Sequence, residues 1–154
     1  MIIQRVGSDD VSLQFAKATV LIKPDHFLVN DYSIDMPGEF DVAGISFEVG
    51  EGFSVINGDS LRLLVVLQNH PALSSDAISK VEDVELVIAY AETDPKHRND
   101  LATIISDLEP RGIVVMGSAE DTKALTGKTV ESSSKVKISS GDLEGEEISV
   151  WSIA

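Results

Sequence analysis

The stretch DSLRLLVVLQNHPALSSDAISKVEDVELVIAYAETD, residues 59–94, decides the fold class of this chain. It contains two apolar runs of strand length, residues 61–67 and 84–90, which have the composition of strands covered on both faces. Between them lies a polar loop that carries His70, followed by a short helical pattern over residues 74–81. This order predicts an α/β protein, in which chemistry is usually placed on loops that leave the C-terminal ends of strands.

The residues before this stretch have the pattern of a strand meander. Short alternating runs separated by turn residues predict strands through residues 1–67, packed as one sheet with a covered face. The connection over residues 25–35 is expected to hold one short strand, around residues 27–29. MPGEF, residues 36–40, predicts a tight type II turn in which the Pro sets φ and the Gly takes a positive φ. Asn57-Gly58-Asp59 predicts a hairpin turn.

The residues after this stretch alternate between helical and strand patterns. Asp94-Pro95 is a strong helix start, with Asp as the N-cap and Pro at the first helical position. Gly127 is placed to end a second, shorter helix. The expected elements are helices over residues 95–108 and 119–126, a buried strand over 112–116, and terminal strands over 135–138 and 148–153.

Composition limits the partners and the location that we expect. The chain of 154 residues has the length of a single domain, residues 1–154, and a net charge of −14 that repels nucleic acid and anionic membranes. It has no apolar run of membrane-spanning length, and its first residues lack the pattern of a signal peptide, so a cytoplasmic location is expected. The absence of Cys excludes thiol catalysis, disulfides and thiolate metal ligands.

Few residues are placed for chemistry. The three histidines form no local metal-binding motif, no Ser lies in a G-x-S-x-G elbow, and no glycine-rich phosphate loop occurs. His97 is interpreted as a solvated surface residue beside the start of the Asp94 helix. His26 follows Asp25 and could meet His70 in space, where a nearby carboxylate such as Asp31 could complete a weak site for a divalent ion. The candidate metal-binding residues are His70, His26, Asp25 and Glu39.

Several stretches carry a resemblance to a known family. IDMPGEFDVAGISF, residues 34–47, is similar to the segment I-D-G-P-G-E-Y-E-V-x-G-V and is the most specific match. The segment I-D-G-P-G-E-Y-E-V-x-G-V is typical of the UlaG-like branch of the metallo-β-lactamase superfamily. This branch of small hydrolases includes relatives of ascorbate-6-phosphate lactonase. The resemblance implies an α/β fold, a metallo-β-lactamase-like αββα sandwich, here truncated and strand-rich. The other similar stretches are VGS (6–8), ATVLIKP (18–24), NGDSLRLLVVLQNHPALSSDAI (57–78), DVELVIAY (83–90), ISDLEPRGIVVMGS (105–118) and KVKISSGDLEGEEISVWSI (135–153).

The departures from the family pattern bear on activity. The resemblance implies a metal loop H-x-H-x-D-H after residue 24, but the chain passes almost directly to MPGEF. His70 is the one ligand of the implied set that can survive. Ser8 stands where the family's early turn has His, and Lys23 where the strand end has Asp. Leu67 stands at the implied bridging-carboxylate position and Gly117 at that of the last metal His. Because a zinc site needs at least three protein ligands, this set predicts a chain that has lost its metal site.

Two functions follow as hypotheses. The first is a non-catalytic binding or assembly module without a cofactor, which forms a homo-oligomer through the sheet face that the missing metal loop and its helix would leave exposed. The alternative is a metal-dependent hydrolase with an unusual reduced site, loaded with zinc, manganese or iron. That site would be built from His70, His26 and carboxylates such as Asp25 or Glu39.

Overall fold

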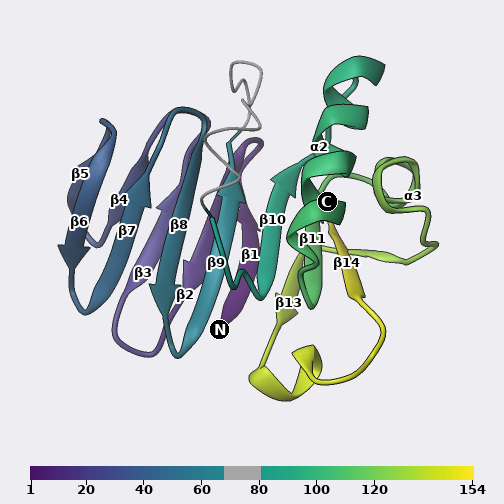
Figure 1. The fold of residues 1–154 in the computed structure, drawn as a ribbon. Coiled ribbons are helices and arrows are strands. Elements are labelled where there is room, and N and C mark those ends of the chain that lie inside the picture. Colours follow the sequence, from purple (N-terminus) through teal and green to yellow (C-terminus); the bar gives the residue numbers. More distant parts are fainter. Residues whose placement is uncertain (68–80) are drawn as a thin grey trace.

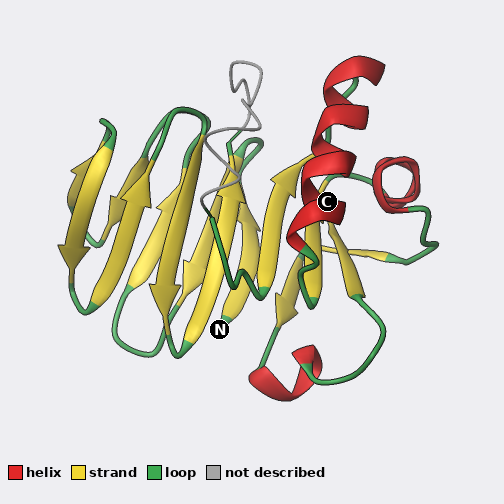
Figure 2. Cartoon of the chain, viewed as in Figure 1, coloured by secondary structure: helices red, strands yellow, loops and turns green. Residues whose placement is uncertain are grey.

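The computed structural model describes residues 1–67 and 81–154, which form two stacked β-sheets with helices beside one of them (Figures 1 and 2). The first sheet has six strands in the order β13-β1-β2-β3-β4-β5, and the second has eight in the order β12-β14-β11-β10-β9-β8-β7-β6. The strands are β1 Ile2–Val6, β2 Asp10–Gln14, β3 Thr19–Ile22, β4 Phe27–Val29, β5 Tyr32–Ile34, β6 Gly38–Val42, β7 Ile45–Val49, β8 Phe53–Gly58, β9 Leu61–Val66, β10 Leu86–Tyr90, β11 Gly112–Met116, β12 Ser132–Ser133, β13 Lys135–Lys137 and β14 Ser149–Ile153. The helices are α2 Pro95–Leu108, α3 Ala119–Thr126 and the 3₁₀ helix η1 Ser140–Leu143.

The parallel part of the second sheet confirms the interpretation of the central stretch. Strands β9, β10, β11 and β14 are parallel neighbours. Every residue of β10 and β11 is buried, which explains their continuous apolar sequences. Their C-terminal ends therefore lie at one end of the sandwich, where an α/β fold places its chemistry.

The main core lies between the two sheets. Ile3, Leu13 and Ile22 of the first sheet pack there with residues of the second, such as Leu63 and Ile88. Phe27 and Phe47 face each other across this core with ring centroids 6.1 Å apart. A tilted aromatic pair of this kind adds about 1 kcal/mol to the area that it buries.

A second core joins helix α2 to the other face of the eight-stranded sheet. Leu101, Ile104 and Ile105 of α2 pack against Val87 and Val115 there. The predicted ends of the helix are confirmed, since the Asp94 side chain accepts a hydrogen bond from the backbone N–H of Lys96 and Pro95 begins the first turn. Both α-helices of the described residues lie beside this sheet, and none lies over the six-stranded sheet (Figure 2). No helix among these residues is long and apolar enough to cross a membrane.

The predicted single N-terminal sheet is wrong, because the strands of residues 1–67 divide between both sheets. The chain crosses from the six-stranded sheet to the eight-stranded sheet at MPGEF, residues 36–40. Residues 36–37 bend, and Gly38 starts β6 with a φ of 145°, rather than the value of about 80° that a type II turn requires. The connection over residues 25–35 holds two strands instead of one, because Asn30 takes a left-handed φ of 53° that lets the chain reverse into β5.

The predicted hairpin turn over residues 57–59 is shifted toward the C-terminus, because Asn57 and Gly58 still belong to β8 and only Asp59 lies in the turn. Asp59 and Ser60 both have positive φ and link β8 to β9, while Gly58 still pairs with Leu61. Tertiary contacts favour this register. A Cβ at Gly58 would lie 2.8 Å from the Phe15 ring, and the Asp59 carboxylate accepts a hydrogen bond from the backbone N–H of Ala16.

The C-terminal expectations are confirmed: α3 ends at its Gly127 cap, and the two terminal strands form. The helix expected over residues 74–81 falls almost wholly outside the described residues.

Candidate functional site

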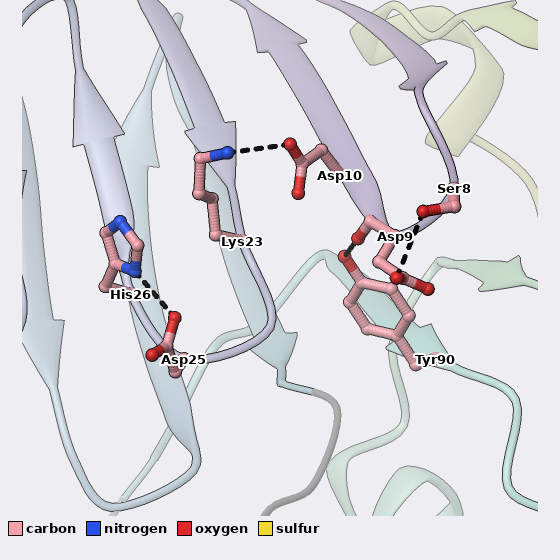
Figure 3. A network of polar contacts seen from close by, with 7 residues as sticks. All are labelled: Ser8, Asp9, Asp10, Lys23, Asp25, His26 and Tyr90. Atoms are coloured by element: carbon pink, nitrogen blue, oxygen red, sulfur yellow. Dashed lines mark hydrogen bonds and ion pairs between the residues drawn. The ribbon is translucent and has the colours of Figure 1, made fainter.

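The candidate site lies where the C-terminal end of β10 meets two turns of the six-stranded sheet. The β1–β2 turn contributes Ser8 and Asp9, the β3–β4 turn contributes Asp25 and His26, and β10 contributes Tyr90 (Figure 3). We call these residues, with Asp10 and Lys23, the strand-end cluster. Each element is short and tightly paired, so the turns hold their polar side chains at a fixed edge of the sandwich.

Lys23 and Asp10 form an ion pair at the centre of the cluster. The Nζ atom of Lys23 lies 2.8 Å from Oδ2 of Asp10, and both side chains are about three-quarters covered. The β2–β3 hairpin explains the pairing. Val11 lies opposite Ile22, so the residues just beyond them lie opposite each other on the outer face of the sheet.

His26 and Asp25 form a second pair on the adjacent turn. The Nδ1 atom of His26 lies 2.6 Å from Oδ1 of Asp25. This hydrogen bond, supported by the charges of His26 and Lys23, lowers the pKa of the Asp25 carboxyl below its ordinary value. Such a pair orients the imidazole and leaves its Nε2 atom outside this contact.

Tyr90 joins the cluster to the eight-stranded sheet. Its hydroxyl donates a 2.8 Å hydrogen bond to the backbone carbonyl of Asp9. Burial raises the pKa of Tyr90 well above its ordinary value, and the carboxylates of Asp10 and Asp9 raise it further. The phenol therefore stays protonated at neutral pH and acts as a hydrogen-bond donor.

The other positions implied by the family pattern hold no metal ligand. Ser8 donates its hydroxyl to the Asp9 carboxylate, and its carbonyl accepts from Arg5. Leu67 is 7% exposed and packs in the core between the sheets. A Cβ at Gly117 would lie 2.6 Å from the Cβ of Ala91, so this backbone position has no room for a His side chain.

The remaining candidate residues do not belong to the strand-end cluster. Glu39 lies on β6 opposite Glu48, and both line a shallow pocket with Val55 on the outer face of the eight-stranded sheet. His26 belongs to the β3–β4 turn of the six-stranded sheet, whereas β6 is an edge strand of the other sheet. The grouping of Glu39 with His26 at one metal site stays a prediction. His97 is 38% exposed and lies 3.8 Å from Asp94 at the start of α2. His70 lies outside the described residues.

The donor set of the described residues does not fit a zinc ion. Within residues 1–67 and 81–154, no three His, Cys, Asp or Glu side chains lie together as a metal-binding group. Zinc sites need at least three such ligands. Asp10 is paired with an ammonium group instead, and a second cation beside Lys23 would be repelled.

One solved structure defines the fold class. The chain matches a protein of Thermotoga maritima, described as a candidate Zn-dependent hydrolase of the metallo-β-lactamase superfamily, with a TM-score of 0.72 over 100% of both chains and 14% sequence identity. The fold is therefore metallo-β-lactamase-like, as the resemblance implied. No protein-family model and no curated protein matches the chain.

Sequence reasoning missed two contacts of the cluster. The Lys23–Asp10 pair had a usable signal, since a hairpin that turns at Ala16-Lys17 sets residues 10 and 23 opposite each other. The Tyr90–Asp9 contact had none, because it joins residues 81 positions apart that belong to different sheets.

Proposed function

We propose that this chain is a non-catalytic protein of the metallo-β-lactamase fold that works as a binding or assembly module. The observation that carries the proposal is the ion pair of Lys23 and Asp10. The family pattern has an Asp at the position of Lys23, at the end of the same strand. In this chain the ammonium group of Lys23 occupies that position and places a positive charge beside the Asp10 carboxylate.

The surroundings of this pair support the proposal. Gly117 leaves no space for a ligand side chain, and Leu67 is part of the hydrophobic core. Restoring the family ligands at these positions would require backbone movement at one and burial of a polar group at the other, which costs about 1–3 kcal/mol when unpaired. The structure around both positions therefore fits Gly117 and Leu67 and would have to change to accept the family ligands.

Zinc titration of the full chain, followed by isothermal calorimetry, tests the proposal. The wild-type chain is expected to give no saturable heat. The variants His26→Ala and His70→Ala are compared with it, and Glu39→Gln, on an edge strand of the eight-stranded sheet, is the matched control. Saturable binding that is lost in both His variants and kept in Glu39→Gln would contradict the proposal.

The second candidate function is a metal-dependent hydrolase with a reduced site, and one contact favours it. Metal-binding imidazoles commonly donate their second nitrogen to a carboxylate, and His26 has this arrangement with Asp25. The site would then use the Nε2 atom of His26 and also His70. Metal-dependent hydrolysis of a phosphate or lactone ester by the purified chain, abolished by His26→Ala, would favour this candidate.

A further inference from the structure

We propose that a second copy of this chain covers the outer face of the six-stranded sheet and forms a two-fold symmetric dimer with it. The inference rests on the proposed function, since it names the partner with which the module assembles. It depends on the row of side chains across the middle of this face, whereas metal binding would depend on the strand-end cluster at one end of it, so the two proposals can fail separately.

The outer face is a regular surface with an aliphatic centre. Alternate residues of β1 to β4 point into the core between the sheets, and the others point outward. No helix of the described residues packs over these outward side chains. Strand register sets one row across the middle of the face, in which Leu21 and Leu28 are half-buried: Gln4, Ser12, Leu21, Leu28 and Ser33.

This face has far fewer acidic side chains than the rest of the chain. The protein has 26 Asp and Glu residues, but the six strands of this sheet carry one of them, Asp10, which is paired with Lys23. Depletion of charge around an aliphatic centre distinguishes the core of an interface from a solvated surface. On a chain with net charge −14, a neutral face is also where two copies repel each other least.

The two lateral edges of the face are complementary in charge. Strand β13 forms one edge and carries the exposed residues Lys135 and Lys137. Strand β5 forms the other edge and is flanked by the exposed residues Asp31 and Asp35. A two-fold axis parallel to the strands stacks β13 of one copy over β5 of the other. The lysines on β13 of each copy then lie opposite the aspartates that flank β5 of the other copy, so the dimer contains this contact twice.

The size of the face suits a small dimer interface. Six strands about 4.8 Å apart and three to five residues long cover about 350 Å² in projection, and the accessible area of a side-chain surface is larger. Standard interfaces bury about 800 Å² per partner, and weaker complexes bury less. We therefore expect a dimer that dissociates on dilution rather than a permanent one.

Sedimentation velocity of the full chain over a wide concentration range tests the proposal. The wild type is expected to shift from monomer to dimer as its concentration rises. Leu21→Glu, at the centre of the face, should raise the dissociation constant by about tenfold or more. Ile148→Glu is the matched control, since Ile148 is an exposed aliphatic residue of another surface, 37% exposed, and should leave the dimer intact.

A charge exchange tests the two-fold arrangement without touching the centre of the face. Lys137→Glu should weaken the dimer, and Lys137→Glu combined with Asp31→Lys should restore it, because each contact is then present with reversed signs. Circular dichroism confirms that each variant is folded. A wild-type chain that stays monomeric at all concentrations would overturn the inference, as would a dimer that Leu21→Glu leaves unchanged. A monomer that binds no zinc would still leave the non-catalytic assignment standing.

Discussion

The hydroxyl of Tyr90 donates a 2.8 Å hydrogen bond to the backbone carbonyl of Asp9, and this bond ties the two sheets together at the edge of the candidate site. Tyr90 is at the C-terminal end of β10, and Asp9 lies in the turn before β2. The contact holds the turn that carries Asp10 against the second sheet. The position of the Lys23–Asp10 pair therefore depends on a long-range contact.

Tyr90→Phe should lower the free energy of unfolding by about 1 kcal/mol, because it removes one partly buried hydrogen bond. Urea denaturation followed by circular dichroism measures the change. Tyr32→Phe is the matched control, since Tyr32 is 53% exposed, and it should stay within about 0.5 kcal/mol of the wild type. Equal effects of the two substitutions would contradict the assigned role of the Tyr90 hydroxyl.

Gly58→Ala should lower the free energy of unfolding by about 1–3 kcal/mol, since the new Cβ would lie 2.8 Å from the Phe15 ring and force it to move. The control is Gly141→Ala, where the nearest atom would be 3.7 Å away. Thermal unfolding of both variants separates the close approach from a general effect of replacing Gly. A neutral Gly58→Ala would mean that the β8–β9 register differs from the one described.

Gly38→Ala should lower the free energy of unfolding by about 1 kcal/mol or more, because Gly38 has a φ of 145° that Ala adopts only with strain. Glu39→Gln, at the next residue, should change it by less than about 0.5 kcal/mol, since Glu39 is exposed on the edge strand β6. Denaturant midpoints of the two variants check this contrast. A large loss in Glu39→Gln would assign a structural role to that carboxylate.

The Asp25 carboxyl should titrate below the ordinary Asp pKa of about 3.9, because the folded chain stabilises its ionised form through His26. The contribution of this pair to stability is full above the ordinary pKa and is lost as pH falls through the lowered folded value. Carboxyl-carbon NMR measures the titration, and His26→Ala should return the Asp25 midpoint toward its ordinary value.

Asp142 provides an internal control for that titration. Hydrogen bonds from the backbone and hydroxyl of Ser139 lower the pKa of Asp142, independently of His26. Its midpoint should stay low in His26→Ala. A shift of both carboxyls would indicate a general change in the chain rather than the loss of one contact.

Sequence patterns predicted the elements whose determinants are local. The helix of Asp94-Pro95, the capped end at Gly127 and the buried strands β10 and β11 follow from neighbouring residues alone. Local sequence patterns gave the wrong turn position where contacts with residues distant in sequence determine the backbone conformation. The turn predicted over residues 57–59 is shifted to Asp59-Ser60, because Phe15 and Ala16 of the β2–β3 connection contact Gly58 and Asp59.

The candidate site was predictable to a smaller extent. The sequence named His26 and Asp25 as possible ligands of one ion, and their adjacency could have given the contact between them, as hairpin register could have given Lys23–Asp10. Glu39 and His26 belong to different sheets because the chain crosses from one sheet to the other near residue 37, and no local pattern encodes that crossing. The lack of space at Gly117 likewise depends on Ala91 from a neighbouring connection.

Elemental analysis of the full chain, purified without chelators, tests the central claim most directly. The Lys23–Asp10 ion pair and the absence of a three-ligand group among the described residues predict far less than one equivalent of zinc, manganese or iron per chain. One equivalent of any of these metals, lost in His26→Ala and His70→Ala but kept in Glu39→Gln, would contradict the claim and establish the reduced metal site instead.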